Sequence, residues 1–261
     1  MTLLKHELKQ NRISLLIWTS AITFMLAICI FIYPEMKGEM ESISDVFADM
    51  GSFSAAFGMD QLNFGTLLGY YSIECGNTFG LGGAFFAALC GVGILAKEEK
   101  DRTAEFLLTH PVSRAKIVTQ KLLAVFAQIL ILNVVVYTVS ILSMVAVGET
   151  IPWKEVNLLH MANFLLQIEI TGICFGISAF LKRGSLGVGL GVAIMMYFLN
   201  LISNITESAE FLKYFTPFAY TDGASIVTNV ELDVKLVAIG MVYAVVGIGI
   251  AYWKYTKKDI V

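Results

Sequence analysis

Long apolar runs separated by short polar connections dominate the pattern of this chain. A helix needs about 20 mainly apolar residues to cross a bilayer, and six runs come close to or exceed that length. They are Leu15–Tyr33, Asn77–Ala96, Ile117–Val147, Leu158–Leu181, Leu186–Ser203 and Leu236–Trp253. The third run is long enough to tilt or to extend beyond the bilayer. The pattern therefore predicts an all-α integral membrane protein with six transmembrane helices.

Segments outside these runs are amphipathic. At the start of the chain, Leu4, Leu8 and Leu15 alternate with basic residues at helical spacing, which predicts an amphipathic N-terminal helix at the membrane interface that leads into the first run. Glu41–Phe57 has an apolar face and an acidic face, so we expect a second interfacial helix there. Phe211–Ile226 is too polar to span, and we expect short interfacial or re-entrant pieces that are sheltered by protein.

The composition supports a membrane protein. Hydrophobic residues make up 57% of the 261 residues and charged residues 15%, whereas soluble domains have about 45–50% and about 25%. No linker divides the chain, so we expect a single transmembrane domain over residues 1–261. The lack of a clear internal repeat weakens the interpretation as a secondary transporter built from inverted repeats. The four cysteines are not spaced as metal ligands are. We therefore interpret them as small buried side chains and expect no metal site.

Positive charge is distributed unevenly along the chain. With six spans, both termini lie on the same side of the membrane. Fourteen of the 18 Lys and Arg residues fall on that side, in the terminal segments, in Lys97–Lys121 and in the turn at Lys182 and Arg183. The positive-inside rule therefore places both termini and Lys97–Lys121 in the cytoplasm. We interpret the acids of the other side as a solvated rim, with a site for cationic molecules as the alternative.

The stretch Lys97–Lys121 is more structured than a plain connection requires. Residues 101–109 can form a short helix that Pro111 ends, and Ser113 can cap the helix that becomes the third span. The short helix would present Phe106–Leu108 among charges, which is typical of a docking surface. On these grounds alone, a cytoplasmic turn whose leucines contact lipid is an equally good interpretation.

The same stretch resembles the cytoplasmic signature of type-2 ABC exporter permeases. That signature has an acidic residue, a Thr shortly before Glu-Phe-Leu-Leu, then Pro-Val-Ser-Arg and a later Lys. The matching residues are Glu99, Thr103, Glu105, Phe106, Leu107, Leu108, Pro111, Val112, Ser113, Arg114 and Lys121. Arg102 stands where the family usually has Gly, which affects the start of the helix. The amphipathic start of the chain and YFTPFAYTDG before the last run are also similar, so the resemblance covers essentially the whole chain.

The resemblance implies the function and the assembly. Such permeases form homodimers or heterodimers of six-span subunits, and two ATP-binding cassette ATPase subunits dock on their cytoplasmic side. Residues 101–109 would be the coupling helix, which fits a groove on the ATPase and transmits ATP-driven closure. The residues expected to bind the ATPase are Glu99, Arg102, Thr103, Glu105, Phe106, Leu107, Leu108, Pro111 and Arg114. The family also implies a bacterial cytoplasmic membrane.

The chain itself is not expected to be an enzyme. It lacks the Walker A pattern, and the glycine-rich run Gly184–Gly191 has no Lys and favours close helix packing instead. ATP and Mg²⁺ are therefore expected on the partner, with no cofactor and no nucleic acid bound by this chain. An intramembrane protease is disfavoured because Glu98–Arg102 lies in a charged loop and the histidines lie near the interfaces.

Two carboxylates are candidates for a substrate path. Glu169 falls near the middle of the fourth run, where a buried charge is costly and indicates function by default. Its alternatives are a protonated side chain or a pairing with Gln128 or Asn133 on a neighbouring span. Glu74 lies at the outer mouth of the second run, where entrance lining and simple exposure are both open. The rival function is a stand-alone secondary transporter or channel that uses Glu169 as a proton or ion site. Similar permeases export peptides, lipids, drugs or ions, and the sequence does not distinguish these substrates.

Overall fold

The computed structural model describes residues 2–97, 112–181 and 186–257, and these residues are mostly helical, without a strand. The elements are α1 (Thr2–Asp49), α2 (Ser52–Ala56), η1 (Met59–Gln61), α3 (Leu67–Glu74), η2 (Cys75–Leu81), α4 (Gly82–Gly93), α7 (Arg114–Ala146), α8 (Trp153–Ser178), α9 (Leu186–Ile205), η3 (Glu207–Phe215), η4 (Ala219–Thr221), α10 (Gly223–Asn229) and α11 (Val234–Lys257). η2 is a π-helix, and η1, η3 and η4 are 3₁₀-helices. Six helical stretches in this part of the chain are long and apolar enough to cross a membrane, which confirms the predicted number of spans.

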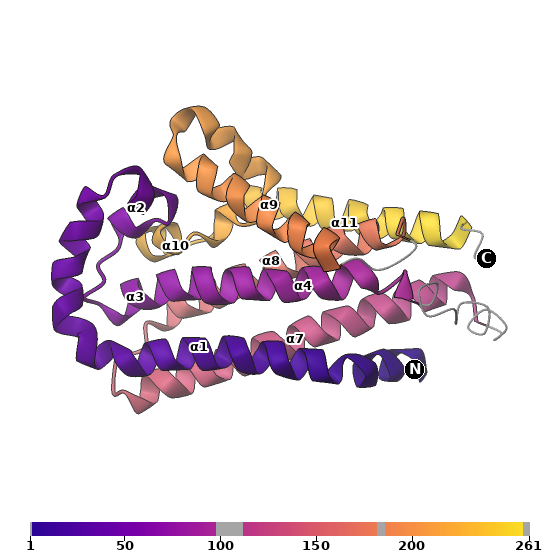
Figure 1. The fold of residues 1–261 in the computed structure, drawn as a ribbon, viewed down its shortest axis with the longest axis horizontal. Coiled ribbons are helices and arrows are strands. Elements are labelled where there is room, and N and C mark those ends of the chain that lie inside the picture. Colours follow the sequence, from indigo (N-terminus) through magenta and orange to yellow (C-terminus); the bar gives the residue numbers. More distant parts are fainter. Residues whose placement is uncertain (1, 98–111, 182–185, 258–261) are drawn as a thin grey trace.

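The long helices run roughly along the longest axis of the molecule (Figure 1). Both termini lie at one end, together with the end of α4 and the start of α7, and we call this the terminal end. At the other end, which we call the opposite end, lie the last turns of α1, together with α2, α3 and α10. The segment 98–111 joins α4 to α7, so its two flanks lie at the terminal end.

The first helix, α1, is continuous over 48 residues. The N-terminal segment is therefore helical as predicted, and it continues without a break into the first span. Pro34 lies inside α1, where a proline removes a backbone hydrogen bond and bends a helix, and Figure 1 shows the last part of α1 turning across the opposite end. The prediction of one helix over Glu41–Phe57 is wrong. α1 ends at Asp49 and α2 begins after Gly51, whose φ of 56° a helix does not allow.

The second span begins at Leu67 rather than at the predicted Asn77. α3, η2 and α4 form one helical stretch, Leu67–Gly93. Its first half carries polar residues, which interrupt the apolar pattern in the sequence, but several of them face the protein interior. The side chains of Tyr71 and Ser72 are both buried. A hydropathy pattern places such polar positions outside the membrane, although neighbouring helices shelter them from lipid.

The most buried of the six spans is α8, which lies between α4 and α11. Small residues bring α8 and α11 close together. A methyl group on Gly172 would lie 2.8 Å from the Cα of Ala244, and one on Gly176 would lie 2.7 Å from the carbonyl oxygen of Gly247. Backbone approach through small residues is the usual basis of helix packing in membranes, because lipid supplies no hydrophobic driving force between helices.

The chain between α9 and α11 does not span. It consists of η3, η4 and α10, which are all short. Phe218 and Tyr220 are buried, and the Thr216 hydroxyl donates to the backbone carbonyl of Met196 in α9 at 2.8 Å. The expected short pieces are therefore present. η4 and α10 contain buried residues as expected, whereas η3 contains none and is not sheltered by protein.

Candidate functional site

One face of α8 is polar although the helix is buried. His160, Asn163 and Gln167 follow one another at helical spacing, and all three are buried. The Tyr71 hydroxyl and Nε2 of His160 share a hydrogen bond of 2.8 Å. Asn133 of α7 donates its side-chain amide to Oε1 of Gln167, also at 2.8 Å. These bonds connect α8 to α3 and α7, so the polar face fixes how three helices align.

Glycines facing α8 make room for this polar face. A methyl group on Gly83 would overlap the side-chain amide of Gln167, and one on Gly80 would lie 2.9 Å from Oδ1 of Asn163. Asn163 also donates to the Leu159 carbonyl at 2.8 Å. The polar face is therefore closely packed at these positions in this conformation.

The predicted path residue Glu169 lies on another face of α8, toward α11. Its side chain is fully buried, and a methyl group on Gly240 would overlap its carboxylate. The Tyr220 hydroxyl lies close enough to interact with this carboxylate, although the two groups do not meet in a well-aligned hydrogen bond. The proposed pairing with Gln128 or Asn133 is wrong, because the side-chain amides of these residues donate to Ala124 and to Ile129 and Gln167. A role of Glu169 in a substrate path stays a prediction.

The second predicted path residue, Glu74, is half-buried at the end of α3. Because this span begins at Leu67, Glu74 lies about 10 Å along the helix rather than at its mouth. The Thr78 hydroxyl donates to Oε2 of Glu74 at 3.4 Å, and Cys29 and Tyr70 lie close enough to interact with the carboxylate. Its role in a substrate path also stays a prediction.

A cavity of about 460 Å³ lies between α1, α4, α7 and α9 in the half of the molecule toward the terminal end. Neutral polar side chains line part of it, namely Asn11 and Ser14 of α1 and Gln128 of α7. Trp18 and several aliphatic residues line the rest, and Lys97 is the charged residue in the wall. The volume is within the range of small-molecule sites, and a largely apolar wall with a few polar groups is typical of them.

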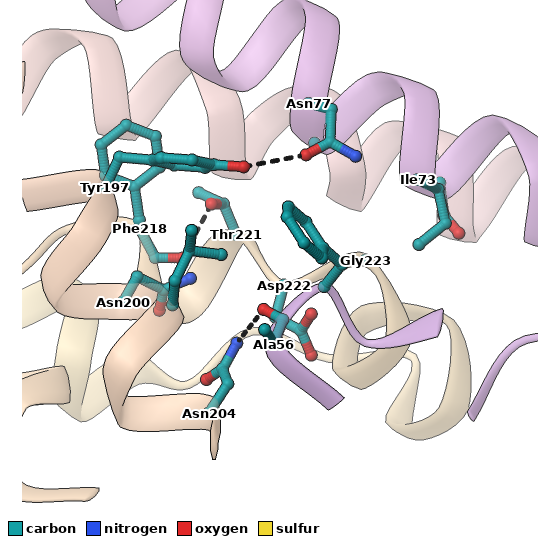
Figure 2. A pocket seen from close by; sticks show the side chains of 14 residues that line it. Ala56, Ile73, Asn77, Tyr197, Asn200, Asn204, Phe218, Thr221, Asp222 and Gly223 are labelled. Atoms are coloured by element: carbon teal, nitrogen blue, oxygen red, sulfur yellow. Dashed lines mark hydrogen bonds between the residues drawn. The ribbon is translucent and has the colours of Figure 1, made fainter. Parts of the chain in front are cut away.

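A much smaller pocket of about 40 Å³ lies toward the opposite end (Figure 2). The Tyr197 hydroxyl of α9 donates to Oδ1 of Asn77 at 3.1 Å, and the Asn204 side-chain amide donates to the Ala56 carbonyl at 3.2 Å. Figure 2 shows Tyr197 and Asn77 pointing toward each other from two helices. The volume admits about three water molecules, so this pocket is too small for most organic substrates.

Asp222 borders the small pocket and directly precedes α10. Its Oδ2 accepts the backbone N–H of Ser225 at 3.0 Å, which caps the helix. Burial raises the pKa of the Asp222 carboxyl, although backbone hydrogen bonds from Ser225 and Ala224 oppose the rise. No three His, Cys, Asp or Glu side chains in the described ranges lie together as a metal site would require.

Most residues predicted to bind the ATPase lie outside the described residues. They are Glu99, Arg102, Thr103, Glu105, Phe106, Leu107, Leu108 and Pro111. Arg114, the remaining one, begins α7 and donates to the Thr256 carbonyl near the end of α11 at 3.4 Å. The predicted cap at Ser113 is confirmed, because its hydroxyl accepts the Lys116 backbone N–H at 3.3 Å.

Comparison with protein families assigns the chain. The family described as "ABC-2 family transporter protein" matches residues 1–260. The chain belongs to this ABC-2 family. No curated protein matches the sequence significantly. Family membership and the six apolar helices together make this ABC-2 chain a multi-pass membrane protein and a component of a transporter.

One residue of interest was missed in the sequence, namely Glu7. It is buried near the start of α1 and pairs with Lys97 and Lys121. Glu7 is the first acid in the chain and stands alone among the bases of the N-terminal segment. That isolation was the available signal, but its partners are 90 and 114 positions away and could not be read from spacing.

Proposed function

We propose that this ABC-2 chain is the permease subunit of an ATP-driven exporter in a bacterial cytoplasmic membrane. The match to the family over residues 1–260 is the observation that carries the proposal. The orientation rests on charge, because the first turns of α1 and α7 and the last turn of α11 carry bases at the terminal end. The positive-inside rule then puts the terminal end in the cytoplasm.

The assembly in this proposal has two permease subunits, identical or different, and two separate ATPase subunits. Segment 98–111 contains the proposed coupling helix. Its flanks at the end of α4 and the start of α7 lie at the terminal end, which supports docking of the ATPase on the cytoplasmic face. ATP and Mg²⁺ bind to the partner, and this chain catalyses no reaction itself.

Export rather than import is part of the proposal because the stretch Lys97–Lys121 resembles the signature of exporter permeases. A space of about 460 Å³ lies toward the cytoplasmic end. Toward the other end lie the pocket of about 40 Å³ and an open groove of about 480 Å³ between α7 and α8. A substrate can therefore be accommodated from the cytoplasm in this conformation. The mixture of Trp18, aliphatic side chains and neutral amides in the larger cavity favours an amphipathic or apolar substrate over a bare ion.

Glu74 and Glu169 remain our candidates for the later part of the path. Neither lines the larger cavity. A path past Glu169 requires α8 to move against α11, because its carboxylate lies directly against Gly240. A carboxylate fully buried within a membrane-spanning helix also supports the second candidate function, a stand-alone secondary transporter with Glu169 as its ion or proton site.

Co-purification tests the proposed function. The tagged protein is extracted in mild detergent beside the variant Phe106→Asp/Leu107→Asp. We expect an ATPase subunit to co-purify with the wild type and to be lost from the variant, because charged side chains would disrupt an apolar docking surface. The matched control is Phe211→Asp/Phe215→Asp, which changes two exposed aromatic residues in η3 on the other side of the membrane.

The control should retain the ATPase. If no ATPase accompanies the wild type, the permease proposal fails, and the secondary transporter becomes the better explanation. If the ATPase stays with both double variants, the complex forms without residues 101–109, and the coupling-helix assignment is wrong.

A further inference from the structure

A buried carboxylate near the start of α1 binds two lysines from distant parts of the chain. Glu7 is only 1% exposed. Its Oε1 lies 3.0 Å from Nζ of Lys121, and its Oε2 lies 3.3 Å from Nζ of Lys97. Each carboxylate oxygen therefore has its own cationic donor, and the two donors come from different elements. We call these three residues the Glu7 ion cluster.

The Glu7 ion cluster also includes a backbone contact. Lys121 is fully buried, and its ammonium donates to the carbonyl of Ile94 at 2.7 Å. Ile94 directly follows α4, whose last carbonyls lack partners within the helix. The cluster thus joins the start of α1, the end of α4 and the second turn of α7.

Stability alone does not explain why charges are kept in this place. Removing two charges from water is costly, and apolar residues of similar size often replace a buried ion pair without loss of stability. An ion pair differs from an apolar contact in direction, because it holds particular atoms at particular distances. A geometric role is therefore the better explanation for Glu7.

The position of the cluster identifies what it holds. Lys97 is the last described residue before segment 98–111, and Lys121 lies shortly after that segment. Glu7 thus contacts both flanks of the segment that follows α4. Lys97 also lines the larger cavity, together with Asn11 and Ser14 of α1. The same helix therefore carries both the carboxylate and part of the cavity wall.

We propose that Glu7 is a positioning residue that ties α1 to both flanks of segment 98–111, so that movement of this segment is passed to the cavity wall. This inference rests on the proposed function, in which an ATPase displaces the segment. Lys97 and Lys121 transmit the displacement to Glu7, and α1 moves with them. Because Ser14 lies two turns after Glu7 on α1, the wall of the cavity shifts relative to α4.

The test separates positioning from folding through a double variant. The complex with its ATPase is reconstituted in nanodiscs as wild type, Glu7→Met, Lys121→Met and the double variant Glu7→Met/Lys121→Met. Each single variant leaves a buried charge with fewer partners and should melt at a lower temperature. The double variant removes both charges and should recover most of the lost melting temperature.

Movement of the cavity wall is measured at the same time. Ser14→Cys is introduced into a background with Cys29→Ala and Cys90→Ala, and its reaction rate with a maleimide is compared without nucleotide and with ATP and vanadate. We expect the rate to change at least about fivefold when Glu7 and Lys121 are present. In all three Met variants it should not change, even in the double variant whose stability recovers. Lys116→Met, an exposed base on the same part of α7, should behave as the wild type.

The outcomes distinguish the two proposals. If the double variant regains both its melting temperature and the nucleotide-dependent rate, the cluster is purely structural and the inference is overturned. An ATPase that co-purifies but produces equal changes in every variant overturns it as well. If no ATPase associates with the wild type, the proposed function fails, and this inference falls with it.

Discussion

The two ends of the molecule are held together by different kinds of contact. At the terminal end, the buried carboxylate of Glu7 binds Lys97 and Lys121, and a large cavity lies nearby. At the opposite end, buried contacts such as that of Tyr33 are neutral hydrogen bonds, and the pocket beside Tyr197 and Asn77 is small. Separating the charges of a buried ion pair costs more free energy than breaking a neutral hydrogen bond. Elements joined by buried ion pairs therefore stay together as they move, whereas elements joined by neutral hydrogen bonds separate more easily. The difference fits a protein that receives force at one end.

The largest effect is expected from breaking the contacts at the terminal end. Lys121→Met leaves the Glu7 carboxylate buried with only Lys97, and we expect a loss of about 3–5 kcal/mol. Thermal unfolding in detergent, followed by intrinsic fluorescence, measures it. Lys116→Met is the matched exposed control and should change stability by less than about 0.5 kcal/mol. Equal effects of the two variants would contradict the contrast between a buried and an exposed base.

Breaking a neutral contact at the opposite end should cost less. The Tyr33 hydroxyl donates to the Gly65 carbonyl at 2.6 Å in a buried site. Tyr33→Phe keeps the ring and its packing against Tyr70 but leaves the carbonyl without this donor, so we expect a loss of about 1–3 kcal/mol. The same unfolding measurement tests it. A loss as large as that of Lys121→Met would show that both ends are equally sensitive.

An exposed ion pair at the opposite end provides a smaller effect. Lys37 lies 3.3 Å from Glu149, and both side chains are partly exposed. Lys37→Met should cost at most about 1 kcal/mol, and the difference should shrink as salt is added. Unfolding at low and high ionic strength measures both. A salt-independent loss would mean that Lys37 acts through packing rather than charge.

The smallest effect concerns pH at the opposite end. Because burial raises the pKa of Asp222, the folded state binds this proton more tightly than the unfolded state. The contribution of Asp222 to stability is therefore fully present below about pH 3.9 and is lost as pH rises through the raised pKa. Asp222→Asn keeps a capping side chain and should melt slightly higher than the wild type at pH 7. The difference should disappear near pH 4. A constant difference across this pH range would contradict the role of the carboxyl charge.

The spans could be predicted from the sequence because each is a long apolar run, and that signal is local. The start of the second span could not, because buried Tyr71 and Ser72 are polar residues sheltered by other helices. The burial of Glu169 was predicted correctly from its place in the fourth run. The residues that contact Glu169 could not be predicted, because Gly240 lies on a helix far along the chain. The same holds for Glu7 and Lys121, whose pairing depends on how α1 and α7 pack.

The continuity of α1 has a mechanical consequence. Between Glu7 and Tyr33 the helix has no break, and at 1.5 Å per residue this distance is about 39 Å. A rigid rod of that length acts as a lever. If its base is held by Glu7 and it tilts by about 10°, its far end sweeps about 7 Å, by the same helix geometry. Such a sweep exceeds the length of a hydrogen bond, so a modest rotation at the base is enough to separate Tyr33 from Gly65 across the membrane.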